Sequence, residues 1–306
     1  MTVSVDLRGV GMNIGVTIFI TDRSVRPDRL GAAVEDRGFQ SLYVSEHTHI
    51  PTERRTPWPP YGDDLPEEYK RTYDPFVSLT AAATTTERIR LGTSICLVAQ
   101  RDPIVTAKSV ASLDDYSRGR FTFGVGFGWN VDEIADHGVD FKQRWDVVRE
   151  HMLVMRALWA DEPTGFEGSY ARVSPSWAYP KPVDRPQPPV LVGGRAGPRL
   201  FRHIAEYADG WISMGGAGVR AALPALRAAE AAAGRPEGDL SVAIMSEADP
   251  AKLAYYAELG VSEVICVLPS DDERTVLDRL DSLVPILEFA DPIHLPDENA
   301  DDGTNA

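Results

Sequence analysis

Short runs of β-branched and aromatic residues alternate along this chain with longer segments of helical period. This alternation constrains the fold most, because strands separated by single helices pair in parallel through crossover connections. The chain has 306 residues, enough for one (β/α)8 barrel of roughly 250 residues. We therefore predict the α/β class and a TIM barrel. The eight expected strands are residues 13–19, 41–45, 90–98, 121–126, 189–192, 210–213, 240–245 and 263–268.

Helix boundaries are marked by prolines, acidic caps and glycines. A proline fits the first helical turn, an aspartate before it caps the helix, and a glycine suits the left-handed position after the last turn. The residues concerned are Pro27, Pro75, Pro103, Pro198, Pro250, Asp74, Asp102, Asp249, Gly38, Gly234 and Gly260. In residues 144–159 an apolar stripe that includes Trp145 and Trp159 predicts a helix. We expect both tryptophans to be core residues.

Two segments interrupt the alternation and predict long loops after strands 2 and 4: residues 48–73 and 161–189. Residues 1–11 are expected to be an N-terminal extension, 12–290 a single barrel, and 291–306 an acidic flexible tail. Aromatic residues in the loops suggest an apolar or aromatic ligand, although loop anchoring would also explain them. They are Trp58, Tyr61, Tyr69, Trp177 and Tyr179.

The charge balance narrows the possible partners. With 46 acidic and 31 basic residues, the net charge of −15 makes binding to nucleic acid or an anionic membrane unfavourable. The N-terminus resembles no secretion signal and no apolar run is long enough to span a membrane, so a cytoplasmic protein is expected. Cys96 and Cys266 both lie in apolar runs, which predicts buried, reduced thiols.

The turn after the fifth strand contains Gly193, Gly194, Arg195 and Ala196, and Pro198 then opens a helix. Adjacent glycines allow a ligand to approach the backbone, and the helix N-terminus and Arg195 favour an anion such as phosphate. The alternative is that the same residues form only a tight strand-to-helix turn and bind no ligand.

The fourth strand ends in a glycine-rich run, GVGFGW, that includes Gly126, Phe127, Gly128 and Trp129. Because its sixth residue is Trp129 rather than glycine or alanine, the dinucleotide fingerprint is excluded. The run could instead admit a flat ring against the backbone, with Trp129 available for stacking.

His47 and His49 form an HxH pair at the end of the second strand. No other histidine ends a predicted strand, so a metal site and a metal-dependent hydrolase are disfavoured. His47 is the better candidate for acid–base chemistry, because the adjacent Glu46 could fix its tautomer. A structural histidine is the alternative.

Six motifs in order give the chain a resemblance to the luciferase-like monooxygenase superfamily, and within it to the coenzyme F420-dependent oxidoreductases. They are MNIGVTIF, YVSEH, ERIRLGTSICLVAQRDPIVTAKSVASLD, GRFTFGVGFGWNVDEI, PPVLVGG and ADGW. The resemblance implies a barrel with a flavin-type ring across the strand ends and a cis peptide between Ser94 and Ile95 that supports the ring. It also implies Glu46 and His47 beside the ring, Gly126 to Trp129 at its edge, and Gly193 to Ala196 near its phosphate.

One position departs from the sugar-phosphate dehydrogenases of this family. They carry an acidic catalytic residue where this chain has Trp129, so the resemblance transfers neither that acid nor that substrate. Glu133 follows at an expected helix start, where a structural role is also reasonable.

The resemblance favours hydride transfer between the deazaflavin coenzyme F420 and a small organic substrate, with His47 as proton donor or acceptor and Glu46 orienting it. One alternative is an FMN-dependent two-component monooxygenase supplied by a reductase partner. Another is a non-catalytic flavin-binding protein. A homodimer is implied only by the family.

Overall fold

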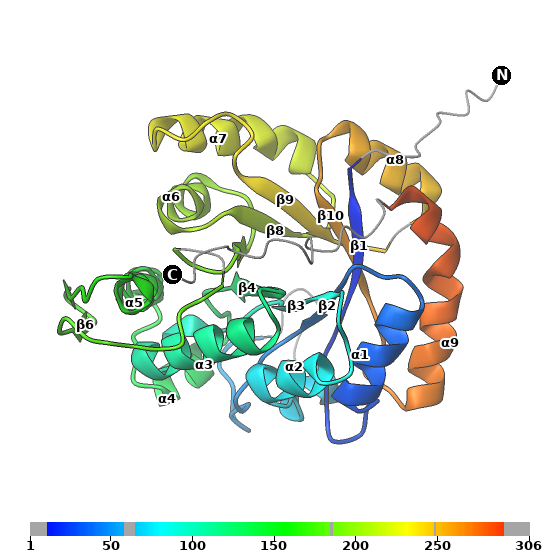
Figure 1. Cartoon of the computed structure of the whole chain (residues 1–306), viewed down its shortest axis with the longest axis horizontal. Coiled ribbons are helices and arrows are strands. Elements are labelled where there is room, and N and C mark those ends of the chain that lie inside the picture. Colours follow the sequence, from blue (N-terminus) through cyan, green and yellow to red (C-terminus); the bar gives the residue numbers. More distant parts are fainter. Residues whose placement is uncertain (1–10, 58–64, 184–185, 248, 291–306) are drawn as a thin grey trace, which may run out of the picture.

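The computed structural model describes residues 11–57, 65–183, 186–247 and 249–290. Its eight main strands close into a parallel barrel in the order β1-β10-β9-β8-β7-β4-β3-β2, with the helices around them (Figure 1). The barrel strands are β1 (Asn13–Ile18), β2 (Ser41–Val44), β3 (Arg90–Thr93), β4 (Phe121–Val125), β7 (Val190–Gly193), β8 (Gly210–Met214), β9 (Ser241–Met245) and β10 (Glu263–Val267). The TIM barrel expected from the alternation is confirmed.

Strand boundaries agree with the sequence within about a residue, except in β3. The expected strand 90–98 is wrong beyond Thr93. There the peptide from Ser94 to Ile95 is cis and the 3-10 helix η2 (Val98–Gln100) follows. These residues stay apolar because they are buried, but burial does not require a strand ladder.

The helices lie between the strands and begin where the caps predict. They are α1 (Pro27–Asp36), α2 (Pro75–Ala83), α3 (Pro103–Tyr116), α4 (Val131–Asp136), α5 (Arg144–Trp159), α6 (Pro198–Tyr207), α7 (Val219–Ala232), α8 (Pro250–Glu258) and α9 (Glu273–Leu283), with 3-10 turns η1 (Glu67–Lys70) and η3 (Val284–Phe289). The side chains of Asp74, Asp102 and Asp249 accept backbone N–H groups as N-caps. Gly38, Gly234 and Gly260 have positive φ angles, as expected.

The hydrophobic core has two layers. A large layer lies between strands and helices, and a smaller cluster fills the barrel interior. The smaller cluster consists of Tyr43, Leu191, Ile212, Ala243 and Ile265. Glu263 is buried with it, accepting hydrogen bonds from Ser41 and, at 2.8 Å, from the Tyr43 hydroxyl. Burial raises the pKa of Glu263, so the barrel floor carries a polar group held by dedicated donors.

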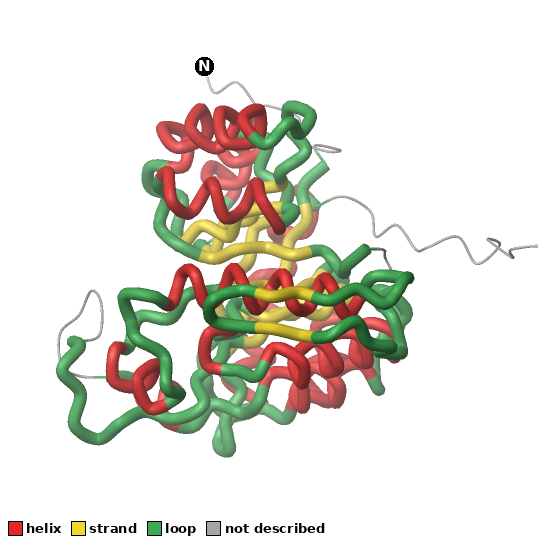
Figure 2. Tube along the Cα trace, turned by 90° about the vertical axis from the view of Figure 1, so that its left-hand side faces the viewer, coloured by secondary structure: helices red, strands yellow, loops and turns green. Residues whose placement is uncertain are grey.

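The second long loop contains a hairpin that the sequence did not reveal. Strands β5 (Phe166–Glu167) and β6 (Arg172–Val173) pair antiparallel and lie against α5 (Figure 2). With two residues each, they are too short to show a period of two. The loop aromatics Trp177 and Tyr179 are largely exposed, whereas Trp58 and Tyr61 lie outside the described residues, as do most of the N-terminal extension and the acidic tail.

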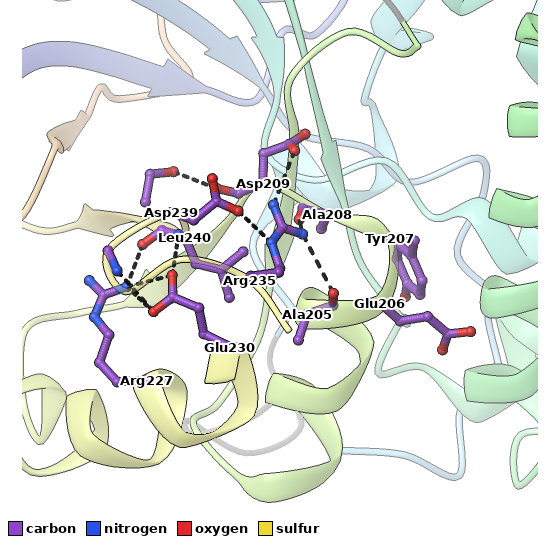
Figure 3. Close-up of polar contacts among 12 residues, drawn as sticks. Ala205, Glu206, Tyr207, Ala208, Asp209, Arg227, Glu230, Arg235, Asp239 and Leu240 are labelled. Atoms are coloured by element: carbon purple, nitrogen blue, oxygen red, sulfur yellow. Dashed lines mark hydrogen bonds and ion pairs between the residues drawn. The ribbon is translucent and has the colours of Figure 1, made fainter. Parts of the chain in front are cut away.

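At the amino ends of β8 and β9, two arginines and a glutamate hold the connecting segments together (Figure 3). Arg235 contacts Asp239 at 2.5 Å and donates to the carbonyl of Ala208 at 2.7 Å. Glu230 is buried and accepts the backbone N–H groups of Leu240 and Gly238, while Arg227 binds its carboxylate. Parallel strands need crossovers, and these contacts fix where one of them enters the barrel.

Both cysteines are buried and unbridged, as expected. Burial, with Glu46 nearby, raises the pKa of the Cys96 thiol well above its ordinary value, so this thiol is a poor nucleophile. No helix among the described residues combines the length and apolar character that crossing a membrane requires.

Candidate active site

A cavity of about 370 Å³ opens at the carboxyl ends of the barrel strands, where barrel enzymes place their chemistry. Ten of the twelve residues that the sequence suggested line it. They are Glu46, His47, Ser94, Ile95, Phe127, Gly128, Trp129, Gly193, Gly194 and Arg195. Gly126 and Ala196 are not among its lining residues, and their role in cofactor binding stays a prediction. Tyr69, one of the loop aromatics that suggested an apolar ligand, also lines it, together with seven residues that the sequence did not suggest: Phe19, Ser45, Leu97, Arg144, Trp145, Met214 and Met245.

His47 is held by Glu133, which lies 86 residues further along the chain. Its Nδ1 is 2.8 and 3.0 Å from the two oxygens of the Glu133 carboxylate. Both side chains are almost completely buried. This contact places a proton on Nδ1 and leaves Nε2 as the nitrogen available to a ligand.

The expectation that Glu46 orients His47 is wrong, because Glu133 makes the contact with the ring. The Glu46 carboxylate instead accepts the Leu97 N–H at 2.7 Å and the Arg101 Nε–H at 2.6 Å. Arg101 also reaches Asp74 at 2.6 Å. Glu46 therefore fixes the segment that follows the cis peptide.

The bulge after β3 places Ile95 in the cavity. Ser94 supports it, since its hydroxyl lies 2.6 Å from that of Thr17 and its carbonyl accepts from Ser45 at 3.0 Å. A Cβ atom on Gly126 would lie only 1.8 Å from Ile95 Cδ1. The absence of a side chain at Gly126 therefore makes room for Ile95.

Aromatic rings lie close to His47. The centroid of the Tyr69 ring lies 5.1 Å from that of His47, and the Trp129 centroid 5.9 Å. Phe19 packs against Tyr69 at 4.6 Å. A polar atom bound here would find His47 as its partner within a largely apolar wall.

The end of the cavity beside β7, which β4 and β3 separate from β2 and His47, carries positive charge. Arg195 follows the β7 glycines, and Arg144 reaches in from the start of α5. The Arg144 Nε atom is buried without a hydrogen-bond partner among the described residues. Burial, together with Arg199, lowers the pKa of Arg144. An anion here would satisfy the orphaned donor and offset the repulsion.

Of the two tryptophans expected in the core, Trp159 is fully buried and Trp145 is not. Trp145 lines the cavity and stacks on Phe127 with centroids 3.6 Å apart. Trp145 packs partly buried against the core, as expected, and in addition borders the cavity, which was not expected. Its position in the first turn of α5, at the barrel mouth, is the signal that could have shown this.

The described part of the first long loop, residues 48–57, is fastened to α4. Arg55 binds Asp132 through its Nε at 2.6 Å and its backbone N–H at 2.8 Å. His49 contacts Asp136 at 3.0 Å, so this second histidine of the HxH pair does not face the cavity. No three metal-ligating side chains among the described residues form a metal site.

The sequence of this chain is similar to those of known proteins. The family model described as luciferase-like monooxygenase matches residues 27–249. An uncharacterised protein of Mycobacterium tuberculosis is 44% identical over 275 residues, covering 88% of this chain and 97% of that protein. An F420-dependent glucose-6-phosphate dehydrogenase of Beutenbergia cavernae is 34% identical over 219 residues, which are 69% of this chain and 60% of that enzyme.

Among solved structures, an F420-dependent secondary alcohol dehydrogenase in complex with an F420-acetone adduct superposes with a TM-score of 0.68. It is 18% identical, and the match covers 93% of this chain and 99% of that one. At this identity the likeness concerns the fold.

Proposed function

Since this chain belongs to the luciferase-like monooxygenase family, we propose that it is an oxidoreductase that uses coenzyme F420 for hydride transfer to or from a small organic substrate. The observation that carries the proposal is the His47–Glu133 pair beside a cavity whose far end is cationic. The names of the F420-dependent relatives support the choice of cofactor.

The cavity residues fit such a cofactor in three respects. Ile95 on the bulge offers a surface for the face of a flat ring. The β7 glycines, Arg195 and Arg144 suit its phosphate-bearing tail. The orphaned Nε of Arg144 is the kind of donor that a bound anion satisfies. When bound, a deazaflavin supplies or accepts the hydride.

His47 handles the proton in this proposal. Glu133 holds the ring by Nδ1, so the proton to be moved is the one at Nε2, facing the substrate. By the resemblance, Trp129 stands where the sugar-phosphate branch has its acid, and its indole N–H is a hydrogen-bond donor that does not act as an acid. The surrounding rings of Phe19, Tyr69 and Trp129 exclude water from the Nε2 side.

The proposal is tested by titrating the purified protein with F420, FMN and reduced FMN. We expect F420 to bind most tightly. Tight binding of FMN without measurable affinity for F420 would overturn the cofactor assignment and favour the two-component monooxygenase. Binding without turnover of any substrate would favour the carrier protein.

A homodimer, a cytoplasmic location and a flavin or deazaflavin reductase as partner stay predictions. Light scattering of the purified protein would measure its oligomeric state. A mass equal to that of one chain, 33.5 kDa, would exclude the dimer.

A further inference from the structure

Charge is distributed unevenly around the cavity. Arg144 and Arg195 both lie at the end formed by the β7 turn and the start of α5. Neither takes part in an ion pair with any other described residue. The wall around His47, at the other end, is made by the rings of Phe19, Tyr69 and Trp129. An anionic group in this cavity is therefore drawn to the arginine end and away from His47.

A second cavity, of about 710 Å³, adjoins the first at Phe19 and Tyr69, which line both spaces. It extends over the ends of β9 and β10. Its other lining residues are Pro66, Glu68, Glu247, Val267, Leu268, Pro269, Ser270 and Arg279. A ligand that reacts at His47 and is longer than a few atoms would pass this aromatic pair to reach the second cavity.

The second cavity holds no cation free to bind an anionic ligand. Arg279 is the one basic residue among its described lining residues, and its guanidinium lies 2.5 Å from the Glu247 carboxylate. Glu68 adds another acidic side chain. A phosphate or carboxylate placed here would meet two acidic groups and one arginine that is already paired.

We propose, resting on the F420-dependent function above, that the substrate is an uncharged carbonyl compound with an extended apolar body, or the corresponding alcohol. Its reacting carbonyl lies at His47, and its apolar chain runs past Phe19 and Tyr69 along Val267 and Leu268. A phosphorylated sugar, the substrate named for the Beutenbergia cavernae relative, does not fit this distribution of charge.

In the proposed reaction, a ketone gains a hydride from the cofactor and a proton from His47. The carbonyl π bond breaks as a C–H bond forms with the hydride of the reduced deazaflavin. The O–H bond forms with the Nε2 proton of His47, whose ring is left neutral and regains a proton from solvent. The ketone is reduced by two electrons to a secondary alcohol, and the cofactor is oxidised by two.

The test measures ligand binding to the F420-loaded protein by calorimetry. The probes are 2-butanone, 2-hexanone and 2-octanone, with octanoate and glucose 6-phosphate as charged comparisons. We expect the affinity to rise about two- to fourfold for each added methylene group. We expect octanoate and glucose 6-phosphate to bind at least tenfold more weakly than 2-octanone.

Affinity that is independent of chain length, or glucose 6-phosphate binding as well as 2-octanone, would overturn the inference while leaving the cofactor assignment intact. Failure of F420 to load is a separate result that contradicts the proposed function. In that case the same titrations on the protein alone still measure the polarity of the site.

A variant that removes one acidic charge tests whether the pairing of Arg279 with Glu247 is the reason that anions bind weakly. Glu247→Gln leaves Arg279 without its partner, so octanoate affinity should rise about two- to fivefold, as expected for one exposed ion pair. The affinity for 2-octanone should not change. The matched control is Asp281→Asn, which breaks an ion pair with Arg37 outside the cavities and should change neither affinity. No gain for octanoate in Glu247→Gln would show that the pairing of Arg279 does not exclude anions.

Discussion

The two nitrogens of the His47 ring have different surroundings. Nδ1 faces the Glu133 carboxylate, while the ring borders the cavity among Phe19, Tyr69 and Trp129. A buried carboxylate fixes both the orientation of the ring and the location of its protons. In the proposed function, proton transfer therefore depends on a residue that follows β2 and on a residue of α4.

The His47→Ala variant should lose about 10²- to 10⁴-fold in kcat, the usual contribution of a general acid or base. Its affinity for F420 should be nearly unchanged, because the ring contributes a proton rather than cofactor binding. Steady-state kinetics and a cofactor titration measure the two quantities. Equal turnover by the variant would remove His47 from the mechanism. Glu133→Gln should lower kcat less and alter the pH profile, with partial rescue by Glu133→Asp.

Gly126→Ala should weaken F420 binding, because the new methyl group would displace Ile95 from the cavity. Overpacking of this kind also costs about 1–3 kcal/mol of stability. Gly197→Ala is the matched control, since a Cβ there meets no atom within 4 Å. The double variant Gly126→Ala with Ile95→Ala relieves the clash and should recover stability. Titration and urea unfolding measure both effects, and wild-type behaviour of Gly126→Ala would contradict this explanation.

Among single residues of the site, the sequence predicted those at the carboxyl ends of the strands. It did not predict the residues of other elements that contact them. His47 and Gly193 are found because parallel strands place their carboxyl ends at one face. Glu133 contacts His47 only because α4 folds back over the second strand, and no local pattern specifies that contact. Arg144 lies on a helix whose periodicity predicts burial, so its exposure to the cavity could not be read from the sequence.

Among the elements, the α7–β9 connection depends on one buried carboxylate. Glu230 lies in the last turn of α7. Its carboxylate accepts hydrogen bonds from three donors: the N–H groups of Leu240 and Gly238 and the guanidinium of Arg227. These donors lower the pKa of Glu230, although burial alone would raise it.

Glu230→Gln should lower the free energy of unfolding by about 2 kcal/mol, because hydrogen bonds to a charged acceptor are replaced by weaker ones. Urea unfolding at pH 7 measures the difference. Glu237→Gln removes the same charge from an exposed position in the following loop and should be neutral. A loss of similar size in both variants would show that net charge, rather than the buried contacts, is responsible.

Strands and helices were predicted well where local signals agree. The caps at Asp74 and Asp102 and the prolines after them fix helix starts to the residue. The third strand was predicted too long because residues 95–98 remain apolar. Its true end depends on Glu46, which accepts a hydrogen bond from the Leu97 N–H and follows a different strand, β2.

For the whole molecule, buried groups that resist protonation make the fold less stable in acid. Burial, with Arg199 nearby, lowers the pKa of His203 from 6.5 to about 4. Between these values the unfolded chain binds the proton and the folded protein does not. The free energy of unfolding therefore falls as the pH is lowered from 6.5 to 4.

Urea unfolding at pH 7, 5.5 and 4 should show this loss, with a contribution from His203 of at most about 1.4 kcal/mol per pH unit. His203→Gln should flatten the dependence between pH 6.5 and 4. Below pH 4.5, Glu35 and Glu230, whose pKa values are lowered by backbone donors despite burial, add a further loss. Stability that is constant from pH 7 to 4.5 would contradict the role of His203.

The barrel itself could be predicted because its eight strands repeat one local pattern, and closure between β1 and β10 follows from their number. The second cavity could not, since its lining comes from η1, β10, α9 and the segments that follow β1 and β9. Residues from these elements and segments meet there only after the chain has closed.

The attachment of residues 48–57 to α4 has a consequence for protein engineering. Arg55 and His49 reach α4 through Asp132 and Asp136, and the same helix carries Glu133, which holds His47. A loop grafted from a relative without its own α4 would lose these contacts and disturb the proton-handling pair. Residues 48–57 and α4 form one structural unit. Replacing both together would change the loop while keeping a contact partner for His47.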